Sequence, residues 1–156
     1  MSEQRIVSAE RRVSAPAETI FKLIADPARQ PEWDGNDNLS HADQGQRITG
    51  VEQSFTMELT NGQGRVNHVI EFEEGRLIGW KPAPTGEEPR GHLWRWELEP
   101  IDDVTTLVRH TYDWTQLTDE TRFERARATT EETLAASIEK LADAAEGVAS
   151  GAEVTD

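Results

Sequence analysis

The sequence predicts an α+β fold in which a curved antiparallel sheet of about six or seven strands wraps around one long C-terminal helix. Two observations support this prediction. Apolar and polar residues alternate with a period of two through most of residues 51–114, and residues 118–146 repeat with a helical period. The chain has 156 residues, the length of one ordinary domain.

The N-terminal part predicts the first strand and two short helices. The expected elements are a strand at 5–13, a helix at 14–26, a second helical turn at 28–33 and a polar loop at 34–46. Ser14 or Ala15 caps the first helix, because Pro16 suits a first helical turn in which the backbone N–H is not needed. Asp26 and Pro27 end this helix.

The middle of the chain predicts the rest of the sheet. Further strands are expected at 51–59, 65–73, 76–81, 92–99 and 104–114, with a loop rich in proline and glycine at 82–91. Each strand has an apolar side, which we expect to face the helix. The inward residues are Val51, Phe55, Met57 and Leu59; Val66, His68, Ile70 and Phe72; His92, Trp94, Trp96 and Leu98; and Val104, Thr106, Val108, His110, Tyr112 and Trp114.

The last two strands form a hairpin whose register places aromatic and imidazole rings side by side. If the hairpin closes around residues 100–103, Leu98 faces Val104 and His92 falls opposite His110. A similar count around Glu74 and Gly75 brings His68 near Trp80 or Pro82 at the same end of the sheet. We therefore expect three histidines in a row across one rim of the sheet.

The C-terminal part predicts one long helix, from Thr118 as its cap to Gly147 as its stop, roughly 28 residues or about 42 Å. The side chains on its inward side are small near the start of the helix and larger toward its end. The inward residues are Phe123, Ala126, Thr130, Leu134, Ile138, Leu141 and Ala145. Residues 1–147 form the expected domain, and residues 148–156 form a flexible acidic tail.

The small inward residues Ala126 and Thr130 predict a cavity over the N-terminal half of this helix. They are too small to fill the space above a concave sheet, whereas Leu134 and the residues after it pack solidly. The loops at 34–46 and 82–91 would roof the opening. The alternative is that indoles from the sheet fill this space as ordinary core, since protein interiors are dense.

Composition narrows the classes of partner. The formal net charge of −14 opposes binding to nucleic acid or to anionic membranes, and no segment is long and apolar enough to be inserted in a bilayer. The absence of cysteine excludes disulfides and thiolate metal sites and suits the cytoplasm. No metal or other cofactor is expected, because no carboxylate accompanies the histidines on the inner faces. The stretch TDETRFERAR reads as a solvated helix surface.

The chain resembles the START-like helix-grip superfamily, also called SRPBCC, which includes the polyketide cyclase/dehydrase-like proteins and the birch pollen allergens. The resemblance lies in VSAPAETIFKLIADPARQPEWDG at 13–35, GHLWRWELEP at 91–100, TTLVRHTYDW at 105–114 and the long last helix. It implies a sheet that encloses a cavity for a hydrophobic or amphipathic small molecule. It does not imply one chemistry, because this fold serves carriers, hormone binders, cyclases and chaperone activators.

These observations lead to a functional hypothesis: the protein binds a small aromatic, polycyclic or lipid-like molecule between sheet and helix, as a monomer or homodimer. The alternatives are a metal-independent polyketide cyclase, aromatase or dehydratase that uses the same pocket, and a chaperone-associated interaction module. No catalytic residue is assigned. The candidate ligand-binding residues are Phe55, His68, Phe72, Trp80, His92, Trp94, Trp96, His110, Tyr112, Trp114, Phe123, Ala126, Thr130 and Leu134.

Overall fold

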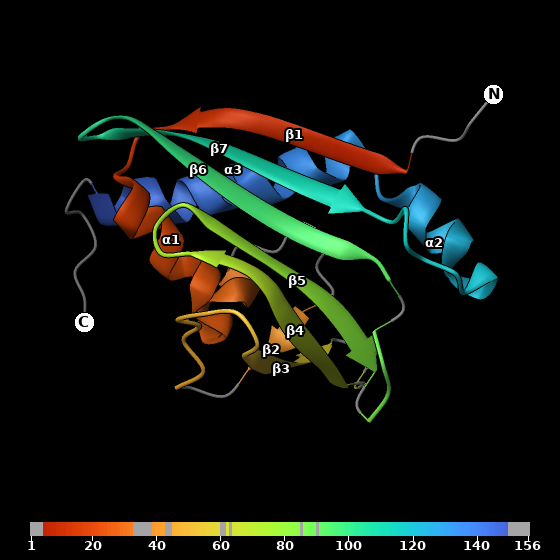
Figure 1. Ribbon diagram of the computed structural model, residues 1–156. Helices are drawn as coiled ribbons and strands as arrows, with labels where there is room; N and C mark the ends of the chain where they lie inside the picture. The colour runs from red at the N-terminus through yellow and green to blue at the C-terminus, as the bar shows by residue number, and fades with distance from the viewer. Residues whose placement is uncertain are drawn as a thin grey trace.

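The fold is one antiparallel sheet with helices packed on its concave side (Figure 1). The computed structural model describes residues 5–32, 39–42, 45–59, 62, 64–84, 86–89 and 91–149. Within these residues the sheet has seven strands in the order β1-β7-β6-β5-β4-β3-β2. They are β1 (Ile6–Val13), β2 (Leu39–His41), β3 (Ser54–Leu59), β4 (Gly64–Glu73), β5 (Leu77–Pro84), β6 (Leu93–Asp102) and β7 (Thr105–Asp113). The predicted α+β helix-grip architecture is confirmed.

Two short helices follow β1, as predicted. They are α1 (Ala17–Ala25) and the 3-10 helix η1 (Pro27–Glu32). Pro16 itself occupies the N-cap position of α1, rather than Ser14 or Ala15. Asp26 has an extended backbone because it precedes Pro27, and this ends the helix. The buried side of α1, which includes Phe21, joins the hydrophobic core.

The predicted single C-terminal helix is wrong, because the chain breaks at Thr129. The segments are η2 (Glu120–Arg122), α2 (Phe123–Ala128) and α3 (Glu131–Ala149), and α3 has 19 residues. Thr129 has an extended backbone, and the Thr130 hydroxyl accepts a 3.4 Å hydrogen bond from the N–H of Thr133. Two β-branched residues whose hydroxyls can replace helical hydrogen bonds thus end one helix and start the next.

The second half of the predicted helix behaves as expected. Leu134, Ile138, Leu141 and Ala145 are buried in the hydrophobic core, where α3 packs against β1, β7 and α1. The helix continues through Gly147 to Ala149, so glycine does not stop it there. Residues 150–156 of the predicted tail lie outside the described part of the chain.

Strand β4 contains a bulge that reverses the predicted facing of its first half. Val69 pairs with Trp80 and Glu71 pairs with Gly79, which leaves Ile70 as an extra residue. Phe72 faces the core as predicted and lies 5.6 Å from Phe21, ring centroid to ring centroid. Before the bulge, Asn67 and Val69 are buried and Ile70 is exposed. The predicted inward set of Val66, His68 and Ile70 is therefore wrong.

The predicted register of the β6–β7 hairpin is also wrong. Leu98 pairs with Val108, Trp96 with His110 and Trp94 with Tyr112, and the strands continue to Asp102 and Thr105. Strand pairing continues beyond Pro100, because proline lacks the backbone N–H but keeps the carbonyl that can accept a hydrogen bond. A register shift follows between Pro100 and Asp102. The inward sides are otherwise those expected, except that Val104 is exposed at the turn.

Several loops differ from the prediction. Strand β5 runs to Pro84, so the loop before β6 is shorter than the predicted 82–91. Val51 lies before β3 and is exposed. The predicted roof at 34–46 falls largely outside the described residues.

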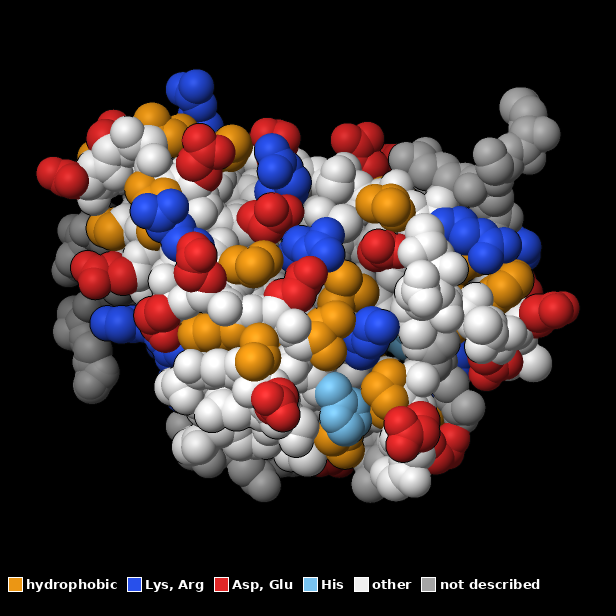
Figure 2. Space-filling view, in the orientation of Figure 1, with side chains coloured by type: hydrophobic (Ala, Val, Ile, Leu, Met, Phe, Trp, Pro, Cys, Tyr) orange, Lys and Arg blue, Asp and Glu red, His pale blue; other side chains and the backbone are white. Residues whose placement is uncertain are grey.

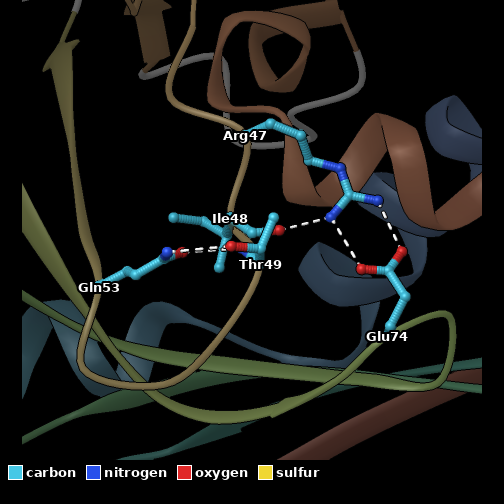
Figure 3. Close-up of polar contacts among 5 residues, drawn as sticks. All are labelled: Arg47, Ile48, Thr49, Gln53 and Glu74. Atoms are coloured by element: carbon cyan, nitrogen blue, oxygen red, sulfur yellow. Dashed lines mark hydrogen bonds and ion pairs between the residues drawn. The ribbon is translucent and has the colours of Figure 1, made fainter.

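The segment before β3 is fixed to the turn between β4 and β5 (Figure 3). The Arg47 guanidinium donates to Glu74 Oε2 at 2.7 Å and also to the carbonyl of Ile48. Gln53 Oε1 accepts from the N–H of Thr49 at 2.7 Å, which closes the loop on itself. These contacts hold the end of the sheet that packs on α1.

The sheet face that points away from the helices is polar and mixed in charge. Lys and Arg side chains alternate with Asp and Glu across it, and hydrophobic side chains are scattered among them (Figure 2). Arg95 lies on this face and donates to both carboxylate oxygens of Glu71, at 2.7 and 2.8 Å. Arg95 thus points away from the core, as the alternation predicts.

Candidate functional site

A cavity of about 370 Å³ lies between the concave face of the sheet and the segment from η2 to the first half of α3. Its volume falls within the usual range for small-molecule sites, about 300–1,000 Å³. Exposed Arg125 and Ala128 line its outer part, and buried Trp96 and His110 line its inner part. The cavity thus opens beside α2 and extends inward to the sheet. This agrees with the predicted position, over the N-terminal half of the helical segment.

Aromatic side chains from three adjacent strands form the inner wall. Trp80 of β5 pairs with Trp94 of β6, and Trp94 pairs with Tyr112 of β7. The Trp94 and Tyr112 rings lie 4.4 Å apart, centroid to centroid. Trp80 is held from behind by Phe55, whose ring meets it edge-on at 5.3 Å. The result is a broad apolar surface of the kind that binds flat rings.

His110 is a fixed, neutral part of this wall. Its ring stacks on Trp96 with centroids 3.7 Å apart, and its Nδ1 donates to the carbonyl of Arg95 at 3.0 Å. Complete burial lowers the pKa of His110 to about 3. Nδ1 therefore carries the proton at neutral pH, and Nε2 is left as a hydrogen-bond acceptor.

His92 and Tyr112 are neutral as well and lie closer to the opening. Burial first, and then the positive charges of Arg122, Arg65 and Arg125, lower the pKa of His92 to about 4. Burial raises the pKa of Tyr112 to about 12. The two rings meet edge-on at 5.9 Å, and Nδ1 of His92 is buried without a hydrogen-bond partner among the described residues. Such an atom can bond to a polar group of a guest.

Part of the predicted site assembles around this cavity. The predicted residues that line it are Trp80, His92, Trp94, Trp96, His110 and Tyr112. Alternation was sufficient to find Trp94 and Trp96 of β6 and His110 and Tyr112 of β7, because both strands are regular along the cavity wall. Their role in ligand binding stays a prediction.

Three predicted residues of β3 and β4 do not line the cavity. Phe55 lies behind Trp80, and Phe72 packs on Phe21 at the other end of the core. His68 belongs to the half of β4 whose facing the bulge reverses, so it is on the outer face. The predicted row of three histidines is therefore wrong, and only His92 and His110 share the cavity.

The predicted residues on and beside the C-terminal helices do not line the cavity, and most lining residues there precede a predicted one by one position in the sequence. Trp114 and Phe123 contact each other at 5.5 Å, with the Arg5 guanidinium above both rings. Ala126 and Leu134 are buried in the core, and Thr130 is exposed at the helix break. The helical residues that do line the cavity are Arg122, Arg125, Ala128, Thr129, Thr133 and Ser137. They form the neighbouring face of the helix, mostly one residue before the predicted stripe.

Sequence reasoning missed several other polar residues of the cavity. Arg65 and Asn67 line it because of the bulge, and Gln30 reaches it from η1. Met57, Leu59 and Pro82 complete the lining. The spacing of Arg122, Arg125 and Thr129, three and four residues apart, was a usable signal, but the stretch was interpreted as solvated surface.

No group of three or more His, Cys, Asp or Glu side chains in the described part of the chain is placed to hold a metal ion. None of the helices described is long and apolar enough to cross a membrane.

Comparison with known proteins identifies the family. Residues 4–146 match the model of the family described as polyketide cyclase / dehydrase and lipid transport. The chain belongs to this family. The START-like resemblance seen in the sequence is confirmed by this match.

Individual proteins show more limited similarity to this chain. The uncharacterized protein Rv0088 of Mycobacterium tuberculosis is 31% identical over 111 residues, which are 69% of this chain and 47% of that protein. The chain thus spans about half the length of the curated relatives it matches. The Zhui aromatase/cyclase from a Streptomyces species has a TM-score of 0.66 at 15% identity, over 92% of this chain and 94% of that one.

Another solved structure with a similar fold is the Aha1 dimer from Colwellia psychrerythraea. It has a TM-score of 0.61 at 22% identity, over 92% of this chain and 97% of that one. At such identities the two structural likenesses establish the shared fold alone.

Proposed function

We propose that this protein binds a small aromatic or polycyclic molecule in the cavity between its sheet and its C-terminal helices. The observation that carries the proposal is the wall of Trp80, Trp94 and Tyr112 around a volume of about 370 Å³. Flat rings can stack on this wall, while neutral His92, His110 and Tyr112 offer a few hydrogen bonds that orient the guest. The cytoplasmic location, the single domain and the monomeric or homodimeric state stay predictions from the sequence.

Tryptophan fluorescence tests this proposal directly, because indoles line the cavity. Titration with naphthalene-2-carboxamide, a neutral bicyclic probe, is expected to change the emission in a saturable way. A Thr133→Trp variant, which fills the cavity from the α3 side, is expected to abolish the change. A Trp114→Phe variant removes an indole outside the cavity and is expected to retain it.

Failure of the proposal would have a clear form. If no aromatic probe of this size, neutral or charged, perturbs the emission of a folded sample, the cavity does not bind aromatic ligands. Native mass spectrometry of protein purified from its own host supplies an independent measurement, since a bound natural ligand would appear as added mass.

A cyclase or dehydratase that uses the same cavity is the second candidate. The family description and the unpartnered Nδ1 of His92 favour it. However, a histidine with a pKa of about 4 is a weak base at neutral pH, and Tyr112 keeps its proton. A His92→Asn variant separates the two candidates. Under pure binding it lowers affinity moderately, whereas an enzyme would still bind its substrate but stop releasing a product lighter by one water.

A surface-mediated interaction module receives less support. Such a module needs a contiguous apolar patch, and the outer face of the sheet carries mixed charges instead (Figure 2).

A further inference from the structure

Three arginines from distant parts of the chain meet at the opening of the cavity. Arg65 comes from β4, on the sheet, while Arg122 and Arg125 come from η2 and α2, on the helical side. Arg65 and Arg122 are half-buried, and Arg125 is exposed. We call these residues the arginine cluster. The charges lie near one another, because Arg122 and Arg125 both contribute to the lowered pKa of Arg65, after burial as the main cause.

The cluster lies in a cavity that has no acidic lining residue among the residues described, although the chain contains 30 Asp and Glu. Arg122 pairs with Asp119, at 3.5 Å from its Nε, but Asp119 is not part of the lining. Nη1 of Arg65 donates to the carbonyl of Gly64 at 3.2 Å. The side chain of Arg125 makes no ion pair or hydrogen bond with any described residue, although its backbone carbonyl accepts from the Thr129 hydroxyl. The positive charge of the opening is thus only partly balanced from within.

This arrangement is unfavourable for the empty protein. Like charges repel each other, and the low-dielectric aromatic wall beside them weakens the screening by water. A protein with a net charge of −14 has many carboxylates that could have neutralised the cluster, yet none lines the cavity in the described part of the chain. An anion supplied from outside would relieve the repulsion. Guanidinium groups are suited to this, because they bind a carboxylate through two parallel hydrogen bonds.

We propose that Arg65, Arg122 and Arg125 bind the anionic group of the ligand, so that the protein selects aromatic molecules carrying a carboxylate over wholly apolar ones. This inference rests on the proposed function and makes it more specific. The aromatic part of the ligand stacks on Trp94 and Tyr112, and the carboxylate stays at the opening between β4 and α2. His92, between the two regions, donates or accepts a hydrogen bond at its unpartnered Nδ1.

The test compares two probes that differ almost only in charge: naphthalene-2-carboxylate and naphthalene-2-carboxamide. Tryptophan fluorescence or calorimetric titration gives both dissociation constants. We expect the carboxylate to bind about tenfold more tightly or better, the usual scale of one charge-assisted pair in a partly dry site. Added salt is expected to reduce this difference, because ions screen exposed charges.

Variants locate the effect. Arg125→Gln and Arg65→Gln are each expected to weaken binding of the carboxylate several-fold and to weaken binding of the carboxamide much less. Arg127→Gln is the matched control: Arg127 is on the same short helix, but its guanidinium lies 5.7 Å from the Phe123 ring and does not line the cavity. Because Arg125 is exposed, its variant keeps the test valid even if Arg65→Gln does not fold.

The possible outcomes are distinct. Equal affinity of the wild-type protein for both probes would overturn this inference and leave the proposed function standing. Equal loss of both probes in folded Arg125→Gln protein would also overturn it, since the arginine would then only support the cavity. Binding of neither probe would overturn the proposed function, and the inference with it.

Discussion

His110 is a buried histidine whose environment forbids its charged form. It stacks on Trp96 and donates to the Arg95 carbonyl, and burial lowers its pKa from 6.5 to about 3. The unfolded chain would protonate it near pH 6.5, so between these values the unfolded state binds more protons. The contribution of His110 to stability is therefore complete above about pH 6.5 and decreases as the pH falls toward 3.

We expect acid to lower the free energy of unfolding with a slope of about 1.4 kcal/mol per pH unit for each such histidine. Urea unfolding at several pH values between about 4.5 and 7 measures this slope. A His110→Asn variant keeps an N–H for the Arg95 carbonyl but cannot titrate, so its slope should be smaller by about one proton. An unchanged slope would show that His110 does not titrate as described.

Gly91 is a second residue whose identity follows from its surroundings. Its φ of +113° is unfavourable for other residues, and a Cβ would collide with the Gln116 carbonyl and lie 2.9 Å from Leu117 N. We expect Gly91→Ala to lower the free energy of unfolding by ~3 kcal/mol, as backbone strain and overpacking add. Gly75→Ala is the control: its φ is +80° but the space around it is open, so only the strain of ~1 kcal/mol should appear. Chemical denaturation of both variants checks the difference.

At the scale of residues, the sequence predicted the cavity-facing aromatic side chains well. Trp94, Trp96 and Tyr112 alternate in strands without irregularity at that point, so counting by two was sufficient. His68 was misplaced because counting backward from Phe72 crosses the bulge at Ile70. A bulge has no strong local signal, and one unrecognised extra residue reverses every side chain beyond it.

At the scale of elements, the break between α2 and α3 shapes the opening of the cavity. The Thr130 hydroxyl accepts from the Thr133 N–H and so caps α3. Thr130→Ala should destabilise the protein by ~1 kcal/mol, and Thr130→Asp should retain the cap. Hydrogen exchange of the first turn of α3 reports the effect, which should be confined to this turn and α2. Exchange that is unchanged in Thr130→Ala would argue against the cap.

The sequence did not reveal this break because the apolar stripe continues across it. Ala126, Thr130 and Leu134 keep helical spacing on both sides, and no proline or glycine marks the interruption. The register of the β6–β7 hairpin was predicted wrongly for a related reason. Pro100 resembled a turn signal, but strand pairing continues beyond it to Asp102. Periodicity identifies elements and their faces, whereas ends and register depend on contacts between elements.

At the scale of the whole molecule, the net charge of −14 acts on stability. Repulsion among carboxylates favours the expanded chain, and salt screens it over about 10 Å at 0.1 M. We therefore expect the melting temperature at neutral pH to rise between low salt and about 0.2 M NaCl, the reverse of a protein held by surface ion pairs. Differential scanning calorimetry measures this, with sucrose at equal osmolality as the control. A lower melting temperature in salt would contradict it.

At the scale of the whole molecule, the aromatic wall of the cavity could be predicted from the sequence, but the arginine cluster could not. The aromatic wall comes from neighbouring strands and follows from local alternation. The arginine cluster forms only because β4, with its bulge, lies close to η2 and α2. These elements are distant in the sequence, since β5, β6 and β7 come between them. No local pattern predicts that meeting. The wall was therefore predictable, and the charge at the opening was not.

The bulge at Ile70 divides β4 into two halves that can be oriented independently. The half after the bulge places Phe72 in the core. The facing of the half before the bulge decides which side chains line the cavity: Arg65 and Asn67, or Val66 and His68. Straightening this strand would exchange a cationic, amide-bearing wall for a more apolar one without changing an amino acid. The polarity of the cavity is thus set by strand alignment as well as by residue identity.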